Sequence, residues 1–347
     1  MHRRTRRTLI IVAAGLVLLA VAIFLRSKAP PEAARLLPES DGIVYVNLKP
    51  FRALLRHYHL KPPQRAAGYQ EFIDATGIDW EQDLDQAAIA LHRMADPNGP
   101  NGPVAYSMVL VGKITGPRLN AWLATHTTAH EVYSGHIIYE IPSDGRTVRV
   151  CQIGYDMLAV SNTPTADPIH SIIERHGTAA WPFAGSALLR QHYHEIPLLS
   201  LAWGVGQIGL PFSQSGAINI FGFQLPLQPR STIVASVAPK LPVLKALRLR
   251  VEEIAPSEQA AASQSASLAT LVTMARGFTA PLAANTANDG LKQLLTTAEV
   301  TQHHDRVVVT ATLAPSFLGA MMRGDNPAPE PTPGTQEGAL SGSPASK

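Results

Sequence analysis

An uncharged apolar run near the N-terminus constrains this chain more than any other feature. Residues 8–25, TLIIVAAGLVLLAVAIFL, contain no Asp, Glu, Lys or Arg. As a helix rising roughly 1.5 Å per residue, they would span about 27 Å, close to the thickness of the hydrocarbon layer of a bilayer. We therefore expect a transmembrane helix here, with the rest of the chain tethered to it.

The charges around this run predict its orientation. Residues 1–7 hold four arginines, whereas only Arg26 and Lys28 follow closely. The positive-inside rule then places residues 1–7 in the cytoplasm and the chain after residue 25 outside it, as in a single-pass bacterial inner-membrane protein. The alternative is a signal peptide cleaved after Ala20–Ala22, but apolar residues continue through residue 25, where a polar cleavage region is expected.

Beyond its N-terminus the chain is close to neutral. Residues 1–28 hold 6 of the 29 basic residues and none of the 26 acidic ones, which leaves 23 basic against 26 acidic residues elsewhere. The pI of about 9.0 therefore reflects the N-terminus. Because no basic block remains, we expect no nucleic-acid partner.

The only cysteine, Cys151, excludes an intrachain disulfide. It lies in RTVRVCQIG (146–154), whose alternation of residue types predicts a strand. A lone cysteine in such a pattern is usually a small buried apolar residue, so we expect no reactive thiol.

Composition divides the rest of the chain into a linker, two halves and a tail. Residues 26–37 are rich in Pro and Ala, which predicts a linker, and residues 324–347 are rich in Pro, Gly and Ser, which predicts a disordered tail. Residues 38–180 and 181–323 are expected to be two α+β halves.

Strand and helix patterns do not alternate strictly, which favours an α+β fold of mostly antiparallel sheets with packed helices. Short strand patterns separated by turn residues over 131–162 predict a meander, and a hairpin is predicted to turn at His303–Asp305. A long Ala- and Ser-rich helix is predicted to begin after Ser257 and to end at Gly277.

Two similarities suggest that the halves are pseudo-repeats. Leu-Leu-Arg is followed by His-Tyr-His in both 54–59 and 188–194, and a strand, a turn and a proline-initiated helix recur at Pro117 and Pro315. The similarity is one of pattern more than of identity, so a chance match stays open.

Three stretches carry a resemblance to a known family. They are LLPESDGIVYVNL (36–48), TGIDWEQDLDQAAIAL (76–91) and VLVGKITGPRLNAWL (109–123). Over about residues 35–175, the chain resembles an uncharacterised family of bacterial single-pass, membrane-anchored extracytoplasmic proteins. The resemblance implies an envelope location and supplies no active-site residues.

Four histidines form the one metal-site hypothesis. His57 and His59, and likewise His192 and His194, are two residues apart, a spacing that shares one face of a strand but points about 200° apart on a helix. Both pairs follow Leu-Leu-Arg at an expected helix C-terminus, where a histidine side chain interacts favourably with the helix dipole. We interpret them as helix-end residues, with a zinc-dependent hydrolase site as the alternative.

No cofactor is expected. GVGQIG (204–209) matches the dinucleotide fingerprint, but Pro211 interrupts the helix that should follow it, and no acidic residue lies where a ribose would be bound.

The segment 196–229 contains 34 residues without Lys, Arg, Asp or Glu. Gly and Pro interrupt it too often for a second membrane span. One interpretation is a buried strand with a glycine-rich loop. The other is an exposed apolar contact surface formed by Phe212, Ile220, Phe221 and Phe223.

These observations favour a membrane-tethered, extracytoplasmic binding or scaffolding module that is not an enzyme. Its partner would be the membrane, through residues 8–25, together with an envelope protein or a hydrophobic ligand. The alternatives are a lipid carrier or sensor that uses 196–229, and the metal-dependent hydrolase described above.

Deleting residues 1–28 should move the protein from the membrane fraction to the soluble fraction, because it removes the apolar helix. Ultracentrifugation of lysates measures this change. The intact protein should also be digested by protease added outside the inner membrane. Protection of the region after residue 28 would contradict the predicted orientation.

Overall fold

The computed structural model describes residues 29–57, 68–143, 145–178, 184–207, 217–220, 223–226, 231–240, 246–278, 286–314 and 317. The expected cytoplasmic segment (1–7), anchor (8–25) and tail (324–347) lie outside these ranges. Within the described ranges, the helices are too short or too polar to cross a bilayer.

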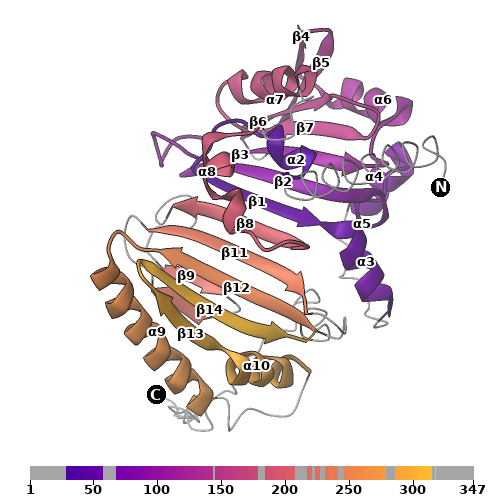
Figure 1. Ribbon diagram of the computed structural model, residues 1–347. Coiled ribbons are helices and arrows are strands. Elements are labelled where there is room, and N and C mark those ends of the chain that lie inside the picture. Colours follow the sequence, from indigo (N-terminus) through magenta and orange to yellow (C-terminus); the bar gives the residue numbers. More distant parts are fainter. Residues whose placement is uncertain are drawn as a thin grey trace, which may run out of the picture.

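One antiparallel sheet of twelve strands runs through the molecule, in the order β13-β14-β12-β11-β8-β1-β2-β3-β7-β6-β5-β4 (Figure 1). The α+β prediction is confirmed, although all described strands except β9 and β10 belong to one long sheet where several sheets were expected. The strands of the first half are β1 (Gly42–Asn47), β2 (Leu84–Arg93), β3 (Val104–Gly112), β4 (Ala129–Tyr133), β5 (His136–Ser143), β6 (Arg146–Gln152) and β7 (Met157–Ser161). Those of the second half are β8 (Ala202–Gln207), β11 (Thr232–Pro239), β12 (Leu247–Ile254), β13 (Glu299–His303) and β14 (Arg306–Leu313), with β9 (Ala217–Ile220) and β10 (Phe223–Pro226) in a separate two-stranded sheet.

Helices connect the strands and cover the sheet. Those before β8 are α2 (Glu32–Arg35), α3 (Leu48–His57), α4 (Tyr69–Thr76), α5 (Trp80–Asp83), α6 (Pro117–His126), α7 (Asp167–Gly177), α8 (Ala187–His192) and the 3₁₀ helix η1 (Tyr193–Glu195). Those after β8 are α9 (Glu258–Phe278) and α10 (Thr286–Thr297).

The two halves join where β1 pairs with β8. The pairing is antiparallel and runs from Gly42↔Gly206 to Val46↔Ala202. Each strand also has a partner on its other side, β2 for β1 and β11 for β8. The backbone groups of this seam are therefore satisfied inside the sheet, as burial requires.

Both halves order their strands in the same way. Moving outward from the seam, the first three strands follow the chain order (β1-β2-β3 and β8-β11-β12), and the last strand of each half, β7 or β14, pairs with the third. Along the chain, helices follow the third strand and precede the outer strands in both halves. These helices are α6 in the first half, and α9 and α10 in the second.

Helices cover both faces of the first half. On the face of Tyr45 and Trp203, which we call the front face, α2, α7 and α8 bury one apolar core. On the back face, apolar residues of α4 and α6 bury a second core against β3, β6 and β7. The strands β3 and β7 are therefore covered on both faces.

The second half is covered mainly on its back face. Leucines of α9 and α10 pack there against alternate residues of β12 and β14. On the front face, the described residues place only the end of α8, η1 and the segment after it. In Figure 1, α2 and α8 are drawn over the first half, whereas β11, β12 and β14 are seen face-on.

Part of the segment expected to be a linker, residues 26–37, belongs to the core. Glu32–Arg35 form α2, and Ala33, Ala34, Leu36 and Leu37 are buried in the front-face core of the first half. The Pro/Ala-rich composition concealed four apolar residues that pack on the sheet.

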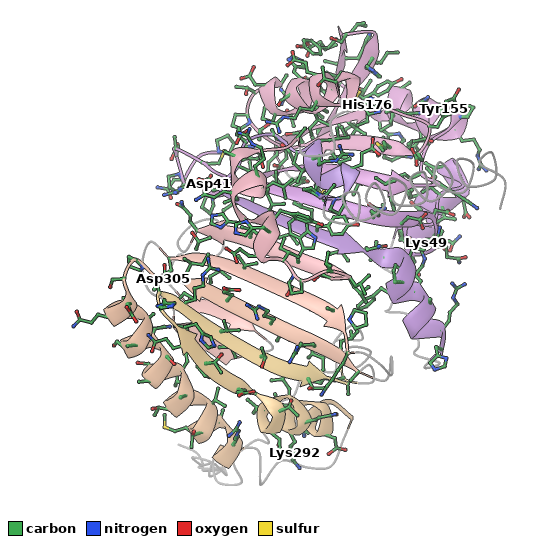
Figure 2. The ribbon with its side chains drawn as sticks, viewed as in Figure 1. Asp41, Lys49, Tyr155, His176, Lys292 and Asp305 are labelled. Atoms are coloured by element: carbon green, nitrogen blue, oxygen red, sulfur yellow. The ribbon has the colours of Figure 1, made fainter. Side chains whose placement is uncertain are left out.

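Cys151 should not react with DTNB in the native protein at pH 8, because it is fully buried and burial raises the pKa of its thiol to about 12. It should react fully in guanidinium chloride, as followed by absorbance. The matched control is Tyr155→Cys, at the 98% exposed position labelled in Figure 2, which should add one fast-reacting thiol. Rapid native reaction of Cys151 would contradict its placement in the core.

Candidate functional site

The segment after η1 crosses the front face between two fixed ends. At one end, Arg306 donates from Nη2 to Glu195 Oε1 (2.8 Å) and from Nη1 to Glu195 Oε2 (2.6 Å). At the other end, the Leu201 N–H donates to the Val237 carbonyl over 2.7 Å. We call residues 196–200, between these ends, the strap.

Pro197 and Ser200 shape the strap. The Ser200 hydroxyl donates to the Pro197 carbonyl over 2.7 Å, and the Ser200 N–H donates to it over 3.3 Å. This turn leaves Leu198 50% and Leu199 68% exposed, and it holds Leu199 at φ +66°. Because a left-handed backbone costs a bulky residue about 1–2 kcal/mol, the strap presents its leucines to solvent at a cost in stability.

A hollow of about 570 Å³ lies beside the strap, over the seam. Tyr45 of β1 stacks on Trp203 of β8 with ring centroids 5.4 Å apart, and Tyr193 of η1 meets Trp203 edge-on at 5.7 Å. Burial raises the pKa of Tyr45 to about 12, so its hydroxyl stays neutral. We call this the aromatic hollow, and its other lining residues are Pro30, Pro31, Asn47, Arg190, His194 and the strap.

A second hollow, of about 600 Å³, lies on the front face and shares Pro197 and Leu198 with the first. We call it the cationic hollow. Its lining residues are Pro197, Leu198, Ser236, Ala238, Pro239, Lys240, Arg248, Arg250 and Thr310. Three of these are basic and none is acidic.

One row of paired residues connects the two hollows. By strand pairing, the row runs through Tyr45, Trp203, Ser236, Arg250 and Thr310. Directly paired residues project from the same face of a sheet. The front face therefore changes from aromatic to cationic along this row.

Arg306 also compensates a buried charge. Its Nη1 donates to Glu252 Oε1 over 2.8 Å, and Arg250 Nη2 donates to Glu252 Oε2 over 2.6 Å. The side chain of Glu252 is only 3% exposed, so these guanidinium groups take the place of water. The hydrogen bonds from Arg306 hold the pKa of Glu195 below its usual value, and the same contacts raise the pKa of Arg306.

Three of the four candidate histidines are described, and they lie at or next to helix ends. His57 is exposed at the end of α3, and His192 ends α8, where burial lowers its pKa. His194 lies in η1, with its Nε2 2.9 Å from Glu195 Oε1, and His59 lies outside the described residues. Figure 1 shows the end of α3 well apart from α8, so His57 is not brought to the other pair. Over the described ranges, no group of three or more His, Cys, Asp or Glu could hold a metal ion.

The predicted apolar contact residues are only partly described. Ile220 and Phe223 pair across the β9–β10 hairpin, whereas Phe212 and Phe221 lie outside the described residues. The uncharged segment 196–229 nevertheless contributes to the site through its start, because the strap and Trp203 line the aromatic hollow.

The basic residues of the site were not predicted from the sequence. In the stretch LRLRVEEI (247–254), the alternation of residues places Arg248, Arg250 and Glu252 on one face of β12. Charged residues at alternate positions of a strand were therefore the available signal for the cationic hollow.

Comparison with solved structures gives a likeness at low sequence identity. No protein-family model matches the chain, and no curated protein matches it. Three crystal forms of TP0453 from Treponema pallidum match, with 10–11% identity and TM-scores of 0.44–0.46. Crystal form III covers 85% of this chain and 99% of its own, and crystal form I covers 86% and 98%. At these scores the likeness carries no inference about binding.

Replacing Arg306 with Met should lower the free energy of unfolding by about 3–5 kcal/mol, because Glu195 loses both hydrogen bonds from the guanidinium and the buried Glu252 keeps only Arg250. Urea unfolding followed by tryptophan fluorescence measures this. The pKa of Glu195 is depressed in the folded state, so its ionised form stabilises the fold above the ordinary Glu pKa of about 4.3. The difference between the two proteins should therefore shrink as the pH falls below that value.

The control for this experiment is Arg175→Met, which removes an exposed ion pair with Glu39 (2.9 Å). It should cost less than about 1 kcal/mol. If Arg306→Met lowers the free energy of unfolding by no more than this control, the Arg306–Glu195 ion pair does not stabilise the fold as described.

Proposed function

We propose that this protein is a membrane-tethered binding module that holds an apolar ligand in the aromatic hollow, without chemical turnover. In this proposal, residues 8–25 anchor the chain in the bacterial inner membrane, with residues 1–7 in the cytoplasm. The sheet domain acts outside the cytoplasm as a carrier or sensor.

The exposed apolar strap beside an aromatic floor is the observation that carries the proposal. Leaving Leu198 and Leu199 half or more exposed forgoes on the order of 1 kcal/mol each of burial free energy. The positive φ of Leu199 adds a backbone cost. An apolar ligand seated against both leucines would recover this loss, which favours binding over a purely structural role for the strap.

The hollow has the size and lining of a small-molecule site. Its volume of about 570 Å³ lies within the range of roughly 300–1,000 Å³ that is usual for such sites. Aromatic and apolar side chains dominate, and a few polar groups at the rim, among them Asn47 and Arg190, could orient the ligand. Among the described residues, no helix covers the front face of β12 and β14 beside it, which gives the ligand a route of entry.

Native mass spectrometry of the full-length protein, released from detergent, tests the proposal. The wild type should carry an apolar adduct that is lost in the double variant Leu198→Asn with Leu199→Asn. Asparagine tolerates a left-handed backbone, so this variant should keep its stability or gain up to about 1 kcal/mol. Stability and ligand binding should therefore move independently.

Val132→Asn is the matched control. Val132 is 67% exposed on β4, at the edge of the sheet farthest from the strap, so its replacement should leave the adduct unchanged. A wild-type protein without any adduct, which also fails to enhance the fluorescence of apolar probes, would refute the proposal.

A further inference from the structure

The aromatic hollow and the cationic hollow lie side by side on one face. Pro197 and Leu198 of the strap line both hollows, so the strap forms the boundary that they share. Trp203 and Arg250 lie in the same row of paired residues, two strands apart. At about 4.8 Å between strands, their backbones are separated by about 10 Å.

Two of the three basic side chains of the cationic hollow form no ion pair with a described carboxylate. Arg250 is engaged by Glu252, but within the described chain no carboxylate forms an ion pair with Lys240 or Arg248, and both are exposed. The Lys240 Nζ makes only a long contact, 3.5 Å, with the Thr312 hydroxyl. Glu252, next to Arg250 on the same face of β12, is hydrogen-bonded to Arg250 and Arg306, and Glu299 lies opposite Thr310 at the sheet edge.

From this arrangement we propose that the two hollows form one site for an anionic amphiphile. Its apolar chain lies on Tyr45, Tyr193 and Trp203 beneath the strap leucines, and its anionic head is bound by Lys240, Arg248 and Arg250. This inference rests on the proposed function and adds the class of ligand. An uncharged apolar molecule would fill only the first hollow and leave Lys240 and Arg248 without an anionic partner among the described residues.

The polar groups suit an oxyanion head. Two guanidinium groups and an ammonium can donate charge-assisted hydrogen bonds, which are about twice as strong as neutral ones. The hydroxyls of Ser236 and Thr310 lie among them.

Photolabelling of the full-length protein in an uncharged amphipol tests the inference. The two probes share one alkyl chain carrying a diazirine and differ only in the head, which is a phosphate monoester in one and phosphocholine in the other. The anionic probe should label peptides that contain the strap and Trp203. At equal concentration the zwitterionic probe should label them about fivefold less, as expected for roughly 1 kcal/mol of charge pairing.

The decisive variant combines Lys240→Gln with Arg248→Gln. Arg250 is retained because it compensates the buried Glu252. Labelling by the anionic probe should fall about fivefold, to the level of the zwitterionic probe, and labelling by the zwitterionic probe should not change. The control variant, Lys113→Gln with Arg93→Gln, removes the same charge from exposed positions elsewhere and should leave both labelling levels unchanged.

The remaining outcomes separate this inference from the proposed function. Equal labelling by both probes, unaffected by the charge variant, would overturn this inference and leave the apolar site standing. Absence of labelling by either probe would overturn both proposals. Inorganic phosphate in excess should not displace the anionic probe, and displacement would mean that a phosphate site alone is present.

Discussion

The antiparallel pairing of β1 with β8 is the contact on which the rest of the structure depends. It joins strands from the two halves of the chain into one sheet and leaves neither with a free edge at the centre. It also brings Tyr45 and Trp203 into direct contact, although they are far apart in the sequence. The floor of the aromatic hollow therefore exists only because the halves are joined in this register.

Helices cover the two halves unequally, and this decides which part of the sheet carries the two hollows. In the first half, helices bury apolar side chains against both faces of β3 and β7. In the second half, the front face of β12 and β14 carries Arg248, Arg250 and Arg306, which a helix could cover only by leaving charges without partners. The strap crosses this face instead, and the Arg306–Glu195 ion pair fixes its position.

Local signals in the sequence predicted much of the fold. The meander after residue 131, the hairpin with His304 at φ +54° and the long helix after Ser257 all follow from turn chemistry and residue periodicity. The β1–β8 pairing did not, because strand pairing at long range leaves no periodic trace. Helix α2 was hidden by its Pro/Ala-rich surroundings. At the candidate site, the lack of charge in 196–229 pointed to the strap, but the lysine and arginines opposite it lie on strands that only the folded sheet brings alongside.

The common strand order of the halves gives the seam the geometry of a twofold dimer interface built into one polypeptide. Two identical subunits paired in this way would have to carry the same covering on both sides of their axis. A single chain is free of that requirement. In this protein, helices can therefore pack on both faces of one half, while the described part of the other half leaves hollows on its front face. A symmetric dimer could not combine these two arrangements.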